Sequence, residues 1–324
     1  AFKYGGQQDA MFVFLLDFLA QYEGMEFMEN MYAGKNADGV YTPEIFRNDT
    51  VGRRPALEAV RNIILKSNGY VDAGDSAKHM FVSQVDFLEG MAYFSPNGSW
   101  LDREASTNFK PGEADVAFMK MPILSAVVNK FPEVFTGTAT QKDEQLSQVI
   151  SYIDGDTQTK PAVLDGHDDA LEYLTEARKI ETSQSMNHPV SIMAYSPRIT
   201  QAKDFLKFMF SKEGQEVMMK SSYGNMLPLN VDPTQFDYYN SSEITELCKS
   251  KLDMFSDCTL VVHNSDKYPL AYRGGYQYDS PQSTLEVAFG GSNPQSVDEY
   301  ITSYFNRMNI NWNTWMGLAG LSNQ

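Results

Sequence analysis

The sequence has little cysteine, little histidine and a shortage of positive charge. Its 324 residues include two Cys, four His and three Trp, and 26 basic residues stand against 42 acidic ones, a formal net charge of −16 at pH 7. A chain with this charge repels phosphate overall, which disfavours nucleic acid and anionic membranes as partners. No uncharged window of 18 apolar residues occurs, so no membrane-spanning segment is predicted.

The usual motifs of enzymes and cofactor-binding proteins are also missing. The sequence contains no Gly-x-Gly-x-x-Gly, no phosphate-loop Lys, no His-Glu-x-x-His and no Gly-x-Ser-x-Gly. The histidines are scattered at positions 79, 167, 188 and 263, and none lies at zinc-ligand spacing from a Cys. We therefore predict no catalytic residues, no metal and no cofactor, and place binding ahead of catalysis.

Three short features leave alternatives open. Cys248 and Cys258 lie ten residues apart, so they either form a disulfide in an exported protein or are two unrelated thiols. Asp154-Gly155-Asp156 is either a plain acidic turn or a calcium site. Asp102 and Glu104 are either a solvated loop or the carboxyl pair of a carbohydrate-active enzyme.

What is present describes an ordinary globular protein. Apolar residues make up 42% and charged residues 21%, and the length suggests about two domains. Helical periodicity or flanking Gly, Pro and capping residues predict helices over 10–23, 53–67, 76–88, 142–153, 167–180, 200–221, 242–255, 280–289 and 296–308. Short strands are predicted over 91–95 and 115–121. Strands between helices favour an α/β layer fold.

The most informative segment runs from Phe87 to Trp100. It reads as a helix end, a Gly stop, a short strand, a Pro-Asn-Gly turn and then an aromatic residue. Such a turn at the carboxyl end of a strand lifts Trp100 toward a ligand crevice, where its flat face suits a sugar ring. Asn97 and Ser99 beside it can supply hydrogen bonds. The alternative is a Trp packed in the core.

This segment resembles the extracellular solute-binding proteins of bacterial ABC importers, the family that includes the maltose-binding protein. Gly90–Trp100 is similar to that family's "G-x-A-A-M-x-x-N-G-x-W". The other similar stretches follow in the family's order and cover nearly the whole chain; they are Ala56–Leu65, Gln84–Gly90, Ala194–Pro197, Ala202–Met209, Ser211–Gln215, Tyr223–Pro228 and Pro294–Glu299. Phe2–Gln7 resembles a segment from the middle of such proteins, beyond the first crossing of the hinge.

The resemblance implies an α/β, periplasmic-binding-protein-like fold of type II, with two lobes joined by a hinge and the second lobe dominant in this chain. Residues 1–189 would be the first part of that lobe, with an insertion at about 132–186. Residues 190–229 would return to the first lobe, and 230–324 would be the C-terminal helices. We expect the chain to lack part of the first lobe. The apolar face of Phe205, Phe208 and Met209 would then be poorly covered.

The resemblance also implies a function in sugar transport. The protein would bind an extracellular solute, a sugar or oligosaccharide, in the cleft and deliver it to the permease subunits of an ABC transporter. It would be a bacterial lipoprotein or periplasmic protein, extracellular or at the cell surface, and not an enzyme. The residues assigned to carbohydrate binding are Tyr4, Gln7, Gln8, Asn97, Ser99, Trp100, Tyr276 and Tyr278. Besides the enzyme named above, an adhesion or scaffold module without a small ligand is the remaining alternative.

Overall fold

The computed structural model describes residues 1–7, 14–47, 52–183, 190–224, 232–262, 268–274 and 285–321. The chain divides into two compact units. Unit 1 consists of Ala1–Gly5, Lys78–Met119 and Met186–Cys258, and unit 2 of Gly6–Ala77, Lys120–Ser185 and Thr259–Gln324. Each unit is thus assembled from three separate stretches of sequence.

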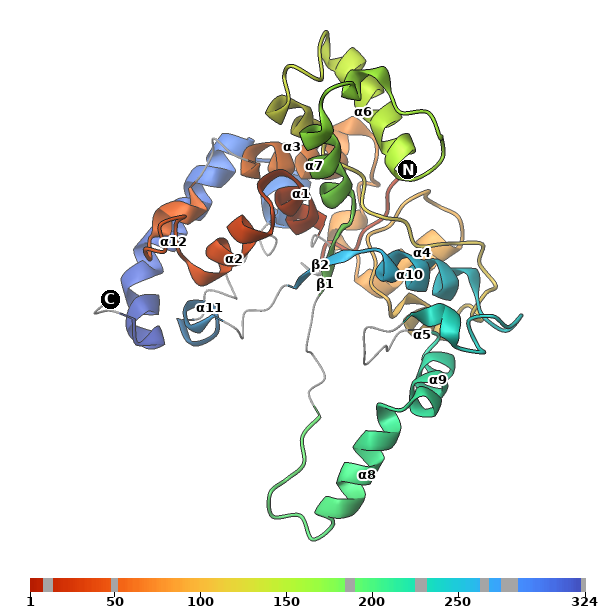
Figure 1. Ribbon diagram of the computed structural model, residues 1–324. Helices are drawn as coiled ribbons and strands as arrows, with labels where there is room; N and C mark the ends of the chain where they lie inside the picture. Colours follow the sequence, from red (N-terminus) through yellow and green to blue (C-terminus); the bar gives the residue numbers. More distant parts are fainter. Residues whose placement is uncertain are drawn as a thin grey trace. The chain divides into compact units, whose positions relative to one another are not determined.

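The regular secondary structure of both units is mainly helical (Figure 1). The α-helices of unit 2 are α1 (Phe14–Glu23), α2 (Met25–Ala33), α3 (Arg53–Ile64), α6 (Ala139–Ile153), α7 (Asp168–Arg178), α11 (Pro269–Gly274) and α12 (Val297–Ala319), and its strands are β1 (Ile180–Ser183) and β2 (Thr259–Val262). Short 3-10 helices, labelled η, lie between them; they are η2 (Pro43–Phe46), η3 (Lys66–Asn68), η4 (Asp75–Ala77), η6 (Ser125–Lys130) and η7 (Ala162–Leu164). The turn η12 (Glu286–Gly290) is π-helical. Unit 1 contains α4 (Met80–Leu88), α5 (Leu101–Glu104), η5 (Ala105–Thr107), α8 (Ile199–Met209), α9 (Lys212–Ser221), η8 (Pro233–Gln235) and α10 (Glu246–Ser256).

The core of unit 2 forms around α1, which is buried on all sides. Every residue from Phe14 to Gln21 is buried, including the polar Asp17 and Gln21. Helices α2, α3 and α7 and both strands pack against it. The long helix α12 adds a stripe of buried residues at helical spacing; they are Val297, Tyr300, Ile301, Tyr304, Met308, Trp312, Trp315, Met316 and Ala319.

Local sequence signals set several helix ends in unit 2 as predicted. Ser296 and Glu299 form a capping box at the start of α12, which confirms the predicted N-terminus of that helix. Helix α1 ends before Gly24, and α3 begins two residues ahead of Pro55. Apart from its first residues, which lie outside the described part of the chain, the predicted helix over 10–23 is therefore confirmed.

Two strands that the sequence did not predict form the sheet of the described chain. β1 pairs with β2 in parallel, with Ile180 opposite Thr259 and Ser183 opposite Val262. The sequence of β2, Thr-Leu-Val-Val, is rich in β-branched residues, and these favour strands. The run is four residues long, too short for periodicity to identify it.

Unit 1 has two small apolar clusters in place of a large core. One joins α9, η8 and α10 through Met219, Phe236, Tyr238, Cys248 and Leu252. The other joins α5 and η5 to α10, and its buried members are Leu101, Ala105 and Leu247. These clusters hold α5 against α10, and so fix the segment that carries Trp100.

Helix α8 of unit 1 has no buried residue. Phe205 is 61% exposed and Phe208 43%. The prediction of a poorly covered apolar face on this helix is therefore confirmed. The predicted region 200–221, either one long helix or two in series split at Gly214, forms two helices. They are separated at Phe210 and Ser211, and Gly214 lies inside α9. A Cβ at Gly214 would lie 1.9 Å from the carbonyl oxygen of Phe208, so this close approach requires glycine.

The two predicted strands over 91–95 and 115–121 are wrong. Phe94 forms a single parallel bridge with Phe2, and no ladder continues from it among the described residues. In the second segment the amide of Phe118 donates to the hydroxyl of Ser250. A strand needs a neighbouring strand to satisfy its backbone N–H and C=O groups. The first segment has a single bridge in place of a neighbouring strand, and the second donates a backbone hydrogen bond to a side chain.

The described chain is thus mainly helical with one parallel strand pair, which does not match the predicted α/β, periplasmic-binding-protein-like fold of type II. The units also have different boundaries from the ranges 1–189, 190–229 and 230–324 expected above. The roles given to those ranges stay predictions. Within the described residues, no helix has both the length and the apolar character needed to cross a membrane.

Candidate functional site

The candidate site is the segment from Asn97 to Glu104 in unit 1, here called the Trp100 loop. Trp100 is partly exposed. Its carbonyl oxygen accepts hydrogen bonds from the amides of Arg103 and Glu104 at 3.0 and 2.9 Å, so Trp100 starts helix α5. The buried Leu101 anchors the next position.

The ring of Trp100 lies directly over Gly98. A Cβ added at Gly98 would lie 2.3 Å from the ring atom Cζ2 and 2.4 Å from Cη2. Any side chain at position 98 would therefore push the indole away. Glycine at this position therefore makes room for the indole against the backbone.

A buried amide holds both ends of the loop. The Gln84 side chain, 1% exposed in α4, donates from Nε2 to Asn97 Oδ1 at 3.0 Å and to Glu104 Oε2 at 2.7 Å. Burial raises the pKa of Glu104, and the hydrogen bond from Gln84 and the charge of His79 oppose that rise. Asn97 also donates from Nδ2 to Ser95 Oγ at 3.5 Å.

A buried lysine holds the middle of the loop from α10. Lys251 is 1% exposed, and its Nζ donates to the carbonyl oxygens of Ser99 at 3.2 Å and Tyr223 at 3.3 Å. Burial lowers the pKa of Lys251 to about 8, while the charges of Cys248 and Asp102 oppose the shift. The Lys251 ammonium therefore bonds to backbone oxygens on two separate segments of unit 1.

Asp102 and Glu104 are attached to different helices. The Thr245 hydroxyl of α10 donates to Asp102 Oδ2 at 3.2 Å, and burial raises the pKa of that carboxyl group. Glu104 is bonded to α4 through Gln84. Residues two apart on a helix point to different sides, so this geometry does not aim the two carboxyl groups at one bond. It favours a structural role over a catalytic pair.

The other predicted site residues lie elsewhere. Tyr4 is fully buried in unit 1, so its ring is not open to a ligand in this structure. Gln7, in unit 2, is exposed and donates from Nε2 to the Ala77 carbonyl oxygen at 2.8 Å. Gln8, Tyr276 and Tyr278 lie outside the described residues. Of the eight predicted residues, the structure brings together Asn97, Ser99 and Trp100.

Local contacts bear on two further alternatives from the sequence, the cysteine pair and the acidic turn. Cys248 and Cys258 are both thiols, and burial raises the pKa of Cys248 to about 11, which makes it unreactive. Asp154 accepts hydrogen bonds from Arg178 through both of its carboxylate oxygens, at 2.9 Å each. Those oxygens already have a cation beside them, which favours the acidic turn over the calcium site.

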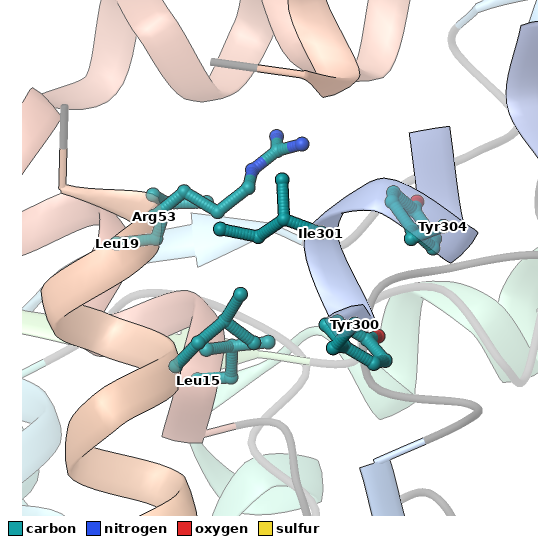
Figure 2. Close-up of a pocket in the computed structure, with 7 residues that line it drawn as sticks. Leu15, Leu19, Arg53, Tyr300, Ile301 and Tyr304 are labelled. Carbon is teal, nitrogen blue, oxygen red and sulfur yellow. The ribbon is translucent and has the colours of Figure 1, made fainter. Parts of the chain in front are cut away.

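A small cavity in unit 2 has an apolar wall and no features of a ligand site (Figure 2). Its lining comes from α1, α3 and α12 and consists of Leu15, Leu19, Arg53, Leu57, Tyr300, Ile301 and Tyr304. The guanidinium of Arg53 donates to the carbonyl oxygens of Phe46 and Ile45. The cavity is thus a packing gap between three helices.

The sequence reasoning missed three polar side chains that hold the loop, the buried Gln84 and Lys251 and the partly buried Thr245. No sequence signal marked Gln84, because α4 buries Ser83 and Gln84 while the apolar Phe81 and Val82 are about half exposed. That pattern is the reverse of an ordinary amphipathic helix.

Comparisons of the chain with family models, curated proteins and solved structures give no match.

Proposed function

We propose that the chain binds an oligosaccharide at the Trp100 loop, as an extracellular solute-binding protein of a bacterial ABC importer. The observation that carries the proposal is the partly exposed Trp100 ring, seated on Gly98 in a loop that buried Gln84 and Lys251 hold in place. An apolar ring beside fixed amide and carboxyl groups suits a sugar, which has a weakly apolar face and many hydroxyls.

The wider role rests on the ordered motifs from Gly90–Trp100 to Pro294–Glu299. In this proposal the solute binds between two α/β lobes of type II, and closure of the hinge presents it to the permease. The protein acts by binding and does no covalent chemistry. Its place is the bacterial cell surface or periplasm.

The charges at the loop narrow the proposed solute to a neutral sugar. Asp102 and Glu104 follow Trp100 within four residues, and the whole chain carries a net charge of −16. Hydroxyl groups can donate to these carboxyl oxygens, whereas the carboxylate of an acidic sugar would be repelled. We therefore expect neutral trisaccharides to bind more tightly than a trimer of galacturonic acid.

The test is a titration of the full chain with maltotriose, cellotriose, xylotriose and trigalacturonic acid, followed by tryptophan emission and calorimetry. A ring that buries ~150 Å² at about 25 cal/mol per Å² contributes roughly 2–4 kcal/mol. Trp100→Ala should therefore weaken the binding of the preferred neutral trisaccharide by about two orders of magnitude, with little change in melting temperature.

The opposite pattern would contradict the proposal. If Trp100 is a packing residue, Trp100→Ala lowers the melting temperature strongly and leaves the affinity of the folded fraction unchanged. Tighter binding of trigalacturonic acid than of every neutral trisaccharide would contradict the assignment of a neutral sugar.

A further inference from the structure

Both N–H groups of the Gln84 side-chain amide donate hydrogen bonds. A buried primary amide carries two N–H groups that must both find acceptors. One goes to Asn97 Oδ1 and the other to Glu104 Oε2, at 3.0 and 2.7 Å. The first acceptor comes three residues before Trp100 and the second four residues after it, so a single amide fixes both ends of the loop.

The two acceptors keep polar atoms available to meet a solute. Within the described residues, the side-chain nitrogen of Asn97 makes only a long contact with Ser95 Oγ, at 3.5 Å, and both Asn97 and Glu104 are partly exposed. The hydrogen bonds from Gln84 orient these groups, because Asn97 must turn its oxygen inward to accept. Its nitrogen is consequently turned away from Gln84.

We infer that Gln84 is a positioning residue of the site: it sets where the Asn97 amide and the Glu104 carboxyl group lie relative to the Trp100 ring. The inference rests on the proposed sugar-binding function of the loop. Gln84 itself touches no solute in this role. Its effect on affinity comes through the two residues that it holds.

The substitution that separates this role from simple packing is Gln84→Glu, which keeps the size of the side chain. It places a carboxylate against Glu104 and removes both donors, so the loop ends lose their link. The double variant Gln84→Glu/Glu104→Gln restores one amide and one carboxylate in reversed order. The new amide at position 104 can donate to the new carboxylate at position 84, and Asn97 can donate to that carboxylate after turning its own amide. Gln201→Glu, at an exposed position on α8, is the matched control for the change in charge.

Two readouts are measured on the full chain. The first is the affinity for maltotriose, cellotriose and xylotriose. The second is acrylamide quenching of Trp100, obtained as the difference between each variant and the same variant carrying Trp100→Phe. Gln84→Glu should weaken trisaccharide binding about tenfold or more and increase the quenching of Trp100. The double variant should return to within about threefold of wild type in both readouts, and Gln201→Glu should change neither.

Retention of affinity and quenching in Gln84→Glu, or failure of the double variant to restore them, would overturn the inference. If wild type binds none of the three trisaccharides, the proposed function fails, while the quenching series still decides whether Gln84 fixes the loop. Should Gln84→Glu not fold, Glu104→Met removes the same hydrogen bond at a partly exposed position. It should increase Trp100 quenching in the same way, and unchanged quenching would count against the inference.

Discussion

The two units bury different kinds of side chain. Unit 2 holds most of the buried apolar residues of the described chain, including Leu16, Phe46 and Phe289. In unit 1 the largest fully buried side chains are Tyr4 and the charged Lys251, and most of the exposed large apolar residues of the chain belong to this smaller unit.

The difference indicates that the units depend on different forces. Burial of apolar surface is the main favourable term in folding, so unit 2 should be sensitive to cavities. Hydrogen bonds add little net stability but are costly to leave unmade when buried. Unit 1 should therefore be sensitive to the geometry of a few polar contacts, such as those of Gln84 and Lys251. The Trp100 loop depends on those contacts.

The largest expected effect comes from truncating a core ring in unit 2. Phe46 is fully buried and packs edge-on against Tyr304 and Trp312. Phe46→Ala should lower the free energy of unfolding by about 3–5 kcal/mol in urea denaturation. The same change at Phe205, exposed on α8, should stay within about 0.5 kcal/mol. Equal losses at the two positions would show that the units do not differ as described.

The second effect is a dependence of unit 2 on pH. Asp17 in α1 is buried and accepts from the Thr182 hydroxyl at 2.5 Å. Burial raises its pKa to about 8, and the charge of the neighbouring Glu181 adds to the shift; burial raises the pKa of Glu181 to about 7. A carboxyl group with a raised pKa contributes stability that is present below its unfolded pKa, near 4, and is lost as pH rises through its folded pKa.

The free energy of unfolding should therefore fall between about pH 4 and pH 8. The charged groups nearest to this pair are Arg178 and Lys120, which lower the pKa of Glu181. Each pKa unit corresponds to about 1.36 kcal/mol, so even half of the rise in the pKa of Asp17 would lower the free energy of unfolding by about 3 kcal/mol at the upper end of this range. Asp17→Asn should flatten the profile, as measured by urea denaturation at pH 5 and pH 8. An unchanged slope in this variant would assign the pH dependence to other groups.

A third test compares two glycines inside helices. A Cβ at Gly214 would press on the backbone of Phe208, so Gly214→Ala should destabilise the junction of α8 and α9 by roughly 1–3 kcal/mol. Gly317 in α12 has open space around it, and Gly317→Ala should stabilise its helix by up to about 1 kcal/mol. Thermal unfolding shows whether each variant is more or less stable than the wild type. A less stable Gly317→Ala variant or a more stable Gly214→Ala variant would contradict the packing described.

The smallest effect on stability should come from Gly98→Ala, although this substitution should displace the Trp100 ring. The nearest atoms to its Cβ would all belong to the Trp100 ring, and a side chain can swing aside. We expect a change in unfolding free energy within about 0.5 kcal/mol, but weaker trisaccharide binding and altered Trp100 emission. Gly74→Ala, with no atom near its Cβ, should leave both readouts unchanged. Wild-type emission in Gly98→Ala would show that the ring does not rest on this residue.

Sequence reasoning predicted many of the helices but missed α2, α11 and the part of α12 beyond residue 308, and both of its strands were wrong. The apolar stripe of α3 and the capping box of α12 depend only on residues close together in sequence, and the structure contains both helices that they predict. A strand depends on a partner that lies far away in sequence, so the 91–95 segment looked like a strand without having a sheet to join. Residues of the Trp100 loop were identified from turn chemistry. Gln84 and Lys251, which hold the loop, come from distant helices and appear only in three dimensions.

The most direct test of the Trp100 loop as the ligand site is hydrogen–deuterium exchange of the full chain with and without a saturating neutral trisaccharide from the panel. Slower exchange is predicted in peptides that cover α4 and residues 97–104 of unit 1, with no change in peptides from α1, α3 and α12 of unit 2. Protection confined to those unit 2 peptides, with exchange at 97–104 unchanged, would contradict the assignment.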